Sequence, residues 1–486
     1  MGTPLPETVA RFSLVDALSL GFGNLSIPDG VELMVPLGAI STDTRTLQPG
    51  AIFVALRGAS FDGHDHVAEA VTKGARLLVV EREVQAPSGV AILRVPSTLD
   101  ALGMFARLHV ERWRALRGRR TIVAITGSAG KTTTRVATAA LLGRLLGEPA
   151  VLATRGNLNN RVGVPMMALC LEQRHHAAVL EMGMNQPGEI KMLTAVAPPD
   201  LAIVTLVAAA HVEGCGSIEA VAHEKGALFR ALDPSGIVVG NSDDARVVSQ
   251  METSRAQRRI HYGAAEGLDL RIAERRPEGL TTSRLTLERY DGSRLSFRTP
   301  LIGEAGAYAC AAAVAAVEAL TGERVTSPIA EEAFALADVG GGGGRLVPRL
   351  LARDVVVIDD SYNANPASSS ASIRTAAELA RDAGRRLVLV LGAMYELGHE
   401  SSRGHDDVGR VAAESGAALV FAVNGDARLI ADRASDAGLP ARFYETSADA
   451  APAVAAAVQP GDLVLVKGSR GVGTERIVRA LAEVPS

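Results

Sequence analysis

The sequence predicts an α/β protein of three domains: a small N-terminal α/β domain, a central doubly wound α/β domain and a C-terminal Rossmann-like α/β domain. The chain has 486 residues, which is more than one hydrophobic core usually serves. Short apolar runs rich in β-branched residues alternate with Ala-rich helical runs, as in α/β folds. The character of this alternation changes twice, and those changes set the domain boundaries.

The first domain covers residues 1–96. Strand-like runs occur in AIFVAL (51–56), RLLVV (76–80) and VAILRV (90–95), with a helical stretch near 66–73. This pattern predicts a small α/β unit.

The second domain covers residues 97–339. A helical segment rich in Arg and Leu (98–117) leads to TIVAIT (121–126), a fully apolar run typical of a central strand in a parallel sheet. Further buried strands are predicted at AAVLEM (177–182), LAIVTLV (201–207) and GIVVG (236–240). Residues 268–299 alternate polar and apolar side chains, which predicts a β meander.

The third domain covers residues 340–486 and begins at five consecutive glycines, Gly340 to Gly344. Such a run disfavours helix and strand and predicts a flexible connection. Four strands are then expected between helices, at DVVVIDD (354–360), RRLVLVLG (385–392), ALVFAV (418–423) and DLVLVKG (462–468). The pattern is Rossmann-like but lacks the Gly-rich fingerprint.

Composition excludes several classes of protein. A net charge of −4 gives no basic field for a nucleic-acid partner. The three cysteines, Cys170, Cys215 and Cys310, are far apart and lack metal-ligand spacing, which argues against disulfides and zinc. The N-terminus lacks a signal-peptide pattern, and the apolar stretch 201–212 is too short to span a bilayer. We expect a cytoplasmic protein without membrane insertion.

The segment TIVAITGSAGKTTT (121–134) runs from a strand into a helix through a Gly-rich turn. Backbone N–H groups near glycines can approach phosphate oxygens, Lys131 can reach the β and γ phosphates, and Thr132 can hold Mg²⁺. The spacing GxxGKT is shorter than the full eight-residue P-loop, so a plain Gly/Ser turn before an amphipathic helix is the alternative. We expect ATP to bind at Gly127, Ser128, Ala129, Gly130, Lys131, Thr132 and Thr133.

Three further polar residues follow apolar runs or lie on a predicted helix. Glu181 ends a predicted strand, where α/β sheets place ligands, and is a natural Mg²⁺ ligand or else a solvated loop acid or a helix cap. His211 follows the next strand, and a structural, hydrogen-bonded histidine is the alternative there. Lys225 lies on a helix and is either functional or a solvated surface charge.

The sequence resembles the Mur ligase family over nearly its whole length. The matching blocks are STDTRTLQPGAIFVALRG with FDGHDH (41–66), TGSAGKTTT (126–134), GNLNNRVGVP (156–165), LEMGMNQPGEI (180–190), AHVEGCGSIEAVAHEKG (210–226), DDSYNANPASS (359–369), LGAMYELGHES (391–401) and LVKGSRG (465–471). DSYNANP and the near-ELG block are similar to the branch that joins D-alanyl-D-alanine to UDP-N-acetylmuramoyl-tripeptide.

The resemblance implies roles for particular residues. The first domain would bind the UDP-sugar through Thr44 and Arg45, and the middle domain would bind ATP. Lys131, Lys225, His211 and Glu181 would be catalytic, with Lys225 carbamoylated, and Mg²⁺ would be held by Thr132, Glu181, His211 and Lys225. Arg345 would contact the nucleotide phosphates and Asp360 the ribose. The remaining substrate contacts would come from Asn159, Asn160, Tyr362, Asn363, Asn365 and Lys467.

The implied reaction is phosphorylation of the tripeptide carboxylate by ATP, followed by attack of the D-alanyl-D-alanine amine on the acyl phosphate. This is the last cytoplasmic step of peptidoglycan precursor synthesis, and we expect a monomer. Another ligase of the superfamily, or a non-catalytic nucleotide-binding relative, is the alternative.

The chain departs from the family pattern at five positions. Ala305, Gly306 and Ala309 replace the His and Asn side chains expected at the adenine. Ala393 replaces an Asp, and Cys215 replaces an aromatic residue. The first three changes remove the side chains that the resemblance implies at the adenine, and Ala393 removes a carboxylate implied for dipeptide binding.

Overall fold

The computed structural model describes residues 3–58, 60–85, 87, 89–337 and 344–483. By compactness the chain divides into two units. The first consists of Met1–Ala124, Pro149–Gly183 and Glu189–Asp200, and the second of Ile125–Glu148, Met184–Gly188 and Leu201–Ser486. Of the predicted glycine connection, Gly340 to Gly343 lie outside the described residues, and Gly344 lies within them.

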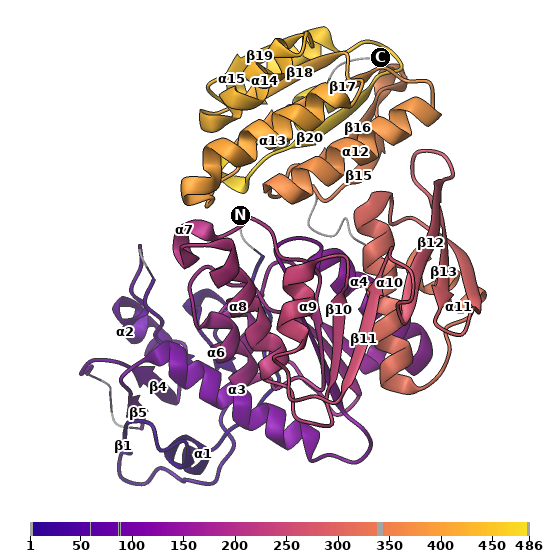
Figure 1. The fold of residues 1–486 in the computed structure, drawn as a ribbon. Helices are drawn as coiled ribbons and strands as arrows, with labels where there is room; N and C mark the ends of the chain where they lie inside the picture. Colours follow the sequence, from indigo (N-terminus) through magenta and orange to yellow (C-terminus); the bar gives the residue numbers. More distant parts are fainter. Residues whose placement is uncertain (1–2, 59, 86, 88, 338–343, 484–486) are drawn as a thin grey trace. The chain divides into compact units, whose positions relative to one another are not determined.

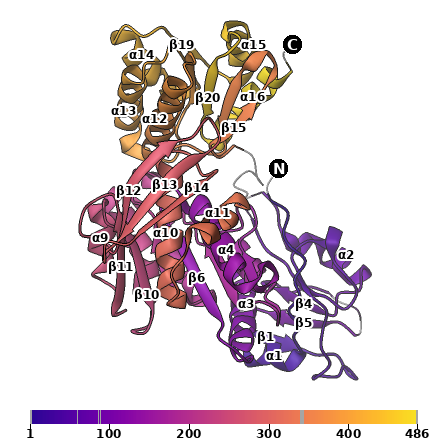
Figure 2. The same ribbon diagram turned by 90° about the vertical axis from the view of Figure 1, so that its right-hand side faces the viewer.

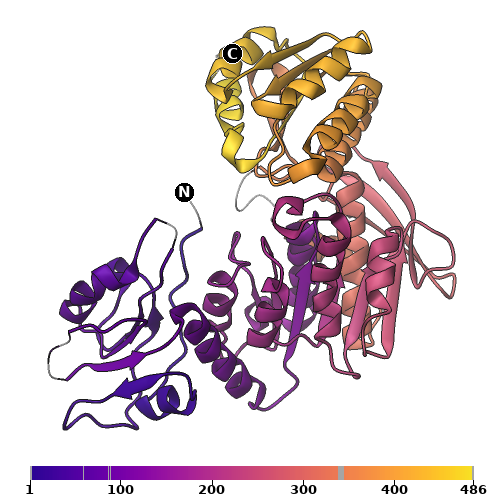
Figure 3. The same ribbon diagram turned by 60° about the vertical axis from the view of Figure 1, so that its left-hand side comes forward.

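A five-stranded sheet of order β1-β5-β4-β3-β2 forms the N-terminal part of the first unit, in indigo to purple in Figure 3. Its strands are β1 (Asn24–Ser26), β2 (Ile40–Ser41), β3 (Ile52–Val54), β4 (Leu77–Val80) and β5 (Ala91–Arg94). All pairs are parallel except β1 with β5. The accompanying helices are α1 (Leu14–Ser19), α2 (Val67–Thr72) and α3 (Thr98–Arg114). The predicted strands and helices of this domain are confirmed, whereas β1 and β2 were missed because two or three residues carry no periodic pattern.

The largest sheet has nine strands in the order β14-β13-β12-β11-β10-β9-β6-β8-β7. These strands are β6 (Thr121–Thr126), β7 (Val151–Ala153), β8 (Ala177–Glu181), β9 (Leu201–Val204), β10 (Ile237–Asn241), β11 (Arg258–Gly263), β12 (Leu270–Pro277), β13 (Ser283–Arg289) and β14 (Arg294–Thr299). Every residue of β6, β8, β9 and β10 is buried. This is the burial expected for strands covered on both faces, and it explains why these four were predictable from continuous apolar runs.

The helices of the same region are α4 (Lys131–Leu146), α5 (Gly163–Ala168), α6 (Glu189–Val196), α7 (Val212–Cys215), α8 (Ile218–Arg230), α9 (Ala245–Met251), α10 (Gly303–Thr321) and α11 (Ser327–Ala335). The predicted meander is confirmed, because β12, β13 and β14 pair antiparallel. Figure 2 shows these long strands beside α10 and α11. Alternating burial along β14 matches a sheet with one covered face.

Helix α10 is the one described helix long and apolar enough to cross a membrane, yet 78% of its most apolar window is buried inside the protein. It packs against α4 and the strands of the nine-stranded sheet. Alanine dominates its sequence, and small side chains allow close approach of neighbouring elements. We therefore interpret α10 as a core helix.

The C-terminal sheet has six strands in the order β15-β16-β20-β17-β18-β19. They are β15 (Val347–Leu350), β16 (Val356–Asp360), β17 (Leu387–Gly392), β18 (Leu419–Val423), β19 (Ala441–Tyr444) and β20 (Leu463–Lys467). Only β15 is antiparallel to its neighbour. Helices cover both faces (Figures 1 and 2): α12 (Pro366–Asp382), α13 (Ser401–Glu414) and α14 (Arg428–Asp436) on one, α15 (Ser447–Ala457) and α16 (Glu475–Ala482) on the other. The predicted Rossmann-like α/β fold is confirmed.

Candidate active site

The segment between β6 and α4 has the strand, loop and helix order that the sequence predicts. The strand ends at Thr126, and the helix begins at Lys131. Its N-cap, Gly130, has φ +80° and ψ −10°, a left-handed conformation that glycine adopts at little cost. The first N–H groups of a helix have no partner within the helix, and the helix dipole makes this end partly positive. The loop is therefore built to hold an anion.

Thr205, which was not predicted as a site residue, supports this loop by hydrogen bonds to its carbonyl oxygens. Its Oγ1 lies 2.6 Å from the carbonyl oxygen of Ala129 and 3.3 Å from that of Thr126, and its N–H donates to the same Thr126 oxygen at 3.0 Å. A Cβ at Gly127 would lie only 1.9 Å from the Thr205 hydroxyl, so the loop needs glycine there. One hydroxyl residue directly after a buried strand is too common a pattern to identify such a role from sequence.

The two intervening carbonyls also accept side-chain hydrogen bonds. Lys131 Nζ donates to Gly127 O at 2.7 Å, and Asn365 Nδ2 donates to Ser128 O at 3.1 Å. The Ser128 hydroxyl donates to Ala208 O and accepts from Ala208 N, both at 3.0 Å. All four carbonyls from residue 126 to 129 are thus bound to donors, which fixes the orientation of the peptide planes.

Lys225 lies on α8 with only 1% of its surface exposed, so the surface-charge interpretation is wrong. Burial, and secondarily the positive charge of Lys131, lower the pKa of Lys225 to about 7. Desolvation disfavours the charged form of a buried amine, and a second cation adds to this effect. Burial and the nearby Lys131 charge therefore both favour the neutral, nucleophilic form of the Lys225 amine.

His211 and Glu396 face each other from two different parts of the second unit. His211 Nδ1 lies 2.5 Å from Glu396 Oε2, and this partner lowers the pKa of Glu396. Both residues have left-handed backbones, with φ of +59° and +63°. The N–H of Glu213 donates to the Glu396 carbonyl at 3.3 Å, so the backbone of the two segments is also joined. Positive φ outside glycine is uncommon and is often found at functional sites.

In the first unit, Glu181 ends β8 and is buried, which excludes a solvated loop acid. Its Oε1 accepts a hydrogen bond of 2.8 Å from Asn159 Nδ2, and the Asn159 carbonyl accepts from Gly183 N at 2.8 Å. Asn160 Oδ1 instead accepts from the backbone N–H groups of Val162 and Gly163 at the start of α5. Asn159 therefore orients the buried carboxylate, and Asn160 shapes the turn beside it.

Thr44 and Arg45, also in the first unit, differ in their exposure. Thr44 is buried, its hydroxyl donates to Glu69 Oε2 at 2.9 Å, and its carbonyl accepts from Lys73 Nζ at 2.8 Å. The side chain of Arg45 is 85% exposed and pairs with Asp43 through two nitrogens. That pairing lowers the pKa of Asp43. Arg45 is the one of the two residues that an anionic ligand can reach from solvent.

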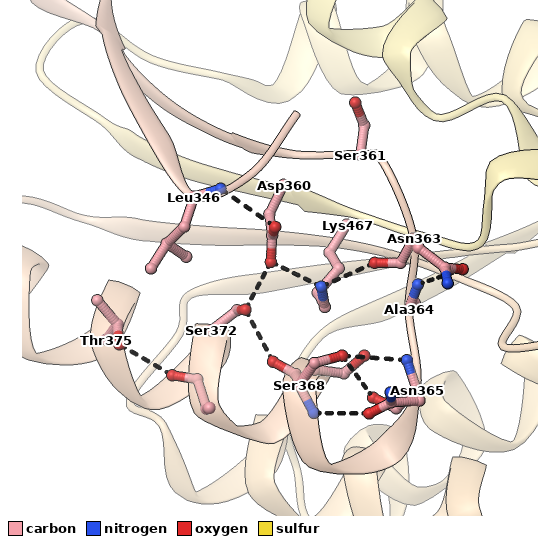
Figure 4. Close-up of polar contacts among 12 residues, drawn as sticks. Leu346, Asp360, Ser361, Asn363, Ala364, Asn365, Ser368, Ser372, Thr375 and Lys467 are labelled. Atoms are coloured by element: carbon pink, nitrogen blue, oxygen red, sulfur yellow. Dashed lines mark hydrogen bonds and ion pairs between the residues drawn. The ribbon is translucent and has the colours of Figure 1, made fainter. Parts of the chain in front are cut away.

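Asp360 is the centre of a buried polar cluster at the carboxyl ends of β16 and β20 (Figure 4). Lys467 Nζ and Ser372 Oγ both donate to its Oδ2 at 2.6 Å, and Leu346 N donates to its Oδ1 at 3.1 Å. Lys467, only 3% exposed, also donates to the Asn363 carbonyl at 2.9 Å. Lys467 thus fixes the loop that follows β16.

Arg345 joins this loop to α4. Its Nη1 donates to Thr132 Oγ1 at 2.5 Å, and its guanidinium lies over the Tyr362 ring, 4.0 Å from the centroid. Such a cation–π contact orients the guanidinium plane. The Tyr362 N–H donates to the Gly344 carbonyl at 2.9 Å, which fixes the strand entry next to Arg345.

The positions that depart from the family at the adenine lie in the first turns of α10. Ala305 is exposed, but Ala309 is 2% exposed. A Cβ at Gly306 would lie 2.2 Å from the carbonyl oxygen of Leu301, so this backbone accepts no side chain at that position. The close packing of α10 therefore accounts for Gly306, and Ala305 is the one of the three that a polar side chain could replace without burial.

The other two departures have different surroundings. Ala393 is 2% exposed, and its backbone is engaged on both sides, donating to Val423 O at 2.9 Å and accepting from Ser469 N at 3.1 Å. Cys215 is partly buried at the last residue of α7. No cluster of three or more His, Cys, Asp or Glu side chains suited to a metal ion occurs within the described ranges.

Three family models match the chain: the Mur ligase family catalytic domain over residues 37–109, the Mur ligase middle domain over 125–317, and the Mur ligase glutamate ligase domain over 344–470. These spans correspond to the three sheets described above.

Individual relatives match over most of their length. The UDP-N-acetylmuramoyl-tripeptide–D-alanyl-D-alanine ligase of Escherichia coli (strain K12) is 35% identical over 458 residues, covering 92% of this chain and 94% of the relative. A crystal structure of MurF from Acinetobacter baumannii superposes with a TM-score of 0.84 at 29% identity, covering 99% and 100% of the two chains. The structure of the MurF ligase of Thermotoga maritima in complex with ADP superposes with a TM-score of 0.76 at 27% identity, covering 91% of this chain and 97% of that chain. Because three Mur ligase family models cover most of the chain and a Mur ligase is 35% identical over 92% of it, the chain belongs to the Mur ligase family.

Proposed function

We propose that this chain is the ATP-dependent ligase that joins D-alanyl-D-alanine to UDP-N-acetylmuramoyl-tripeptide. Relatives that carry this name match almost the full chain. The structural observation that carries the proposal is the attachment of the DSYNANP segment to the phosphate loop, through Asn365 to Ser128 and, beside it, Arg345 to Thr132. A segment typical of this branch is thereby part of the nucleotide site itself.

The nucleotide contacts that we propose follow from the fixed loop. Backbone N–H groups of the loop and of the first turn of α4, between Gly127 and Thr133, would bind the phosphates of ATP. The Ser128 N–H is the exception, because it already donates to the Leu206 carbonyl at 2.8 Å. The Lys131 ammonium has three N–H donors, so it would keep its bond to the Gly127 carbonyl and donate another to a phosphate oxygen. Arg345 would add a second positive charge beside the phosphates. Asp360 would reach the ribose, for which its bonds to Lys467 and Ser372 hold it in position.

In the proposed reaction the protein forms no covalent bond to the substrates, and its main role is to neutralise negative charge on the phosphoryl group. A carboxylate is a poor electrophile, so its oxygen first attacks the γ-phosphorus of ATP and displaces ADP. The amine of D-alanyl-D-alanine then attacks the acyl phosphate carbon, phosphate leaves with the bonding electrons, and the amine loses a proton. Lys131 and Arg345 would stabilise the negative charge on the transferring phosphoryl group.

Mg²⁺ is the expected ion, and Thr132, Glu181, His211 and Lys225 are the residues proposed to hold it. A lysine amine suits this role only after CO₂ adds to the neutral form, since the N–C bond then creates a carboxylate as the nitrogen loses a proton. The burial of Lys225 and its lowered pKa fit that requirement. When bound, Mg²⁺ neutralises charge on phosphate oxygens.

The remaining assignments are also proposals. Residues 1–96 would bind the UDP-sugar, with Thr44 and Arg45 near the uridine or its phosphates, residues 97–339 would form the ATP-binding domain, and residues 340–486 would form the C-terminal ligase domain. Asn159, Asn160, Tyr362 and Asn363 would contribute to the substrate site, for which they are already held in defined loops. Asn365 and Lys467, also expected as substrate contacts, instead bind the Ser128 carbonyl and the Asp360 carboxylate, and we propose that they position the site. We propose a cytoplasmic monomer without membrane insertion or a nucleic-acid partner.

The amine specificity tests this function. Purified protein with ATP, Mg²⁺ and UDP-N-acetylmuramoyl-tripeptide should release phosphate with D-alanyl-D-alanine, at a rate far above that with single amino acids. Phosphate release and the mass of the nucleotide product are the measurements. A single amino acid that equals the dipeptide would assign the chain to another ligase of the superfamily, and no release with any amine would favour a non-catalytic relative.

Replacement of Lys225 tests its proposed carbamate. Lys225→Ala should lower turnover by at least about 100-fold, because a metal-binding carboxylate is lost from the charge-stabilising set. Formate or acetate at high concentration should restore part of the turnover, measured as phosphate release. The exposed Lys191→Ala in α6 should change neither quantity. Normal turnover of Lys225→Ala would contradict the assignment.

Nucleotide choice tests the departures in α10. Because Ala305, Gly306 and Ala309 offer no side-chain hydrogen bonds, GTP should replace ATP more readily here than in relatives with the full motif. Ala305→His should raise the ratio of kcat/KM for ATP over GTP by about tenfold, the worth of one hydrogen bond to the correct base. Ala456→His, at an exposed position of α15, is the matched control. An unchanged ratio would show that other groups recognise the base.

A further inference from the structure

Both polar atoms of the Asn365 side-chain amide form hydrogen bonds, the oxygen within the C-terminal domain and the nitrogen to the phosphate loop. Its Oδ1 accepts from Ser368 N at 2.9 Å, and its own N–H donates to Ser368 Oγ at 3.1 Å, so it forms a capping box at the start of α12. Its Nδ2 donates to the carbonyl of Ser128 at 3.1 Å. Because the cap needs an oxygen acceptor on one side, the amide nitrogen has to face Ser128. The side chain is 7% exposed.

We propose that Asn365 is a positioning residue that makes the docked C-terminal domain a structural part of the phosphate loop. The proposal rests on the proposed function only in taking ATP as the nucleotide. Asn365 acts through the peptide that joins Ser128 to Ala129. Its donor holds the Ser128 carbonyl, and with it the plane of this peptide, and so sets the direction of the Ala129 N–H that would bind a phosphate oxygen.

The bond from Asn365 differs from the other hydrogen bonds to the loop carbonyls in the part of the chain that supplies the donor. Within the described residues, the carbonyls of Thr126, Gly127 and Ala129 are held by Thr205 and Lys131, all from the central region. The donor to the Ser128 carbonyl comes from the segment after β16 instead. The conformation of the loop is therefore complete only when α12 is docked against it.

The segment that carries Asn365 is itself rigidly held. Lys467 Nζ donates to the Asn363 carbonyl at 2.9 Å and to Asp360 at 2.6 Å, and Ser469 Oγ donates to the Ala364 carbonyl at 3.4 Å (Figure 4 shows the first two). Hydrogen bonds at Asn363 and Ala364 thus hold the backbone that leads to Asn365, and Asn365 in turn holds the phosphate loop. Since linked equilibria are reciprocal, a nucleotide bound at the loop should in turn stabilise the docked domain.

Two substitutions separate this role from helix capping. Asn365→Asp and Asn365→Ser both keep an oxygen acceptor at the N-cap but remove the donor to Ser128. The serine variant adds no charge and so controls for repulsion between a carboxylate and the nucleotide. Thr446→Ala removes the N-cap of α15 in the same domain, away from the loop, and measures the loss of a cap alone.

The measurements are the Kd for ADP by calorimetry, kcat/KM for ATP, and the midpoint of thermal unfolding without nucleotide. Both Asn365 variants should unfold within about 4 °C of the unaltered protein while their Kd for ADP rises by about tenfold or more. kcat/KM for ATP should fall in parallel, and the KM for D-alanyl-D-alanine should stay within about twofold. Thr446→Ala should lower the unfolding midpoint and leave the Kd for ADP unchanged.

A Kd for ADP within twofold of the unaltered protein in both Asn365 variants would overturn the proposal. Loss of affinity in Asn365→Asp alone would also overturn it, because charge repulsion would then explain the effect. If Asn365→Asp fails to fold, the result with Asn365→Ser decides. Binding of ADP does not depend on which amine is ligated, so a failure of the proposed amine specificity leaves this test intact.

Discussion

A backbone that presents N–H groups to an anion has to direct its carbonyl oxygens elsewhere, and each buried carbonyl needs a hydrogen-bond donor. In this chain the constraint is met by side chains from three segments: Thr205 after β9, Lys131 at the start of α4 and Asn365 at the start of α12. The close approach of Thr205 also accounts for Gly127, where a Cβ would collide with its hydroxyl. The nucleotide site thus depends on residues far apart in the sequence, although the motif itself is local.

The second constraint is electrostatic. Burial, and to a smaller extent repulsion from Lys131, lower the pKa of Lys225 to about 7. A site prepared for several anionic groups has to carry positive charge before they arrive, which makes a second buried ammonium unfavourable. Loss of the Lys225 proton removes the repulsion between the two ammonium groups. A carbamate on Lys225 would also replace its positive charge with a negative one. The same arrangement that suits phosphates therefore favours a neutral or modified lysine.

Sequence reasoning was most accurate where one local pattern determines the structure. The strands β6, β8, β9 and β10 are buried on both faces, so their apolar runs identify them, whereas β2 and β7 are too short to show any period. The phosphate loop was visible because its glycines, lysine and threonine are contiguous. Thr205 was not, since its role comes from the adjacency of β9 and β6, and the burial of Lys225 depends on packing around α8 that helical periodicity does not specify. Glu396, opposite His211, was missed for the same reason.

The support of the phosphate loop by Thr205 can be tested without any knowledge of the amine substrate. The decisive measurement is the Kd for ADP of Thr205→Ala, compared with Thr205→Ser, which keeps the hydroxyl and loses only a methyl group. Loss of the hydroxyl leaves the Ala129 carbonyl without its donor at 2.6 Å. We expect Thr205→Ala to weaken ADP binding by about tenfold or more, and Thr205→Ser to bind ADP within about threefold of the unaltered protein. Equal affinities of Thr205→Ala and the unaltered protein would contradict this expectation.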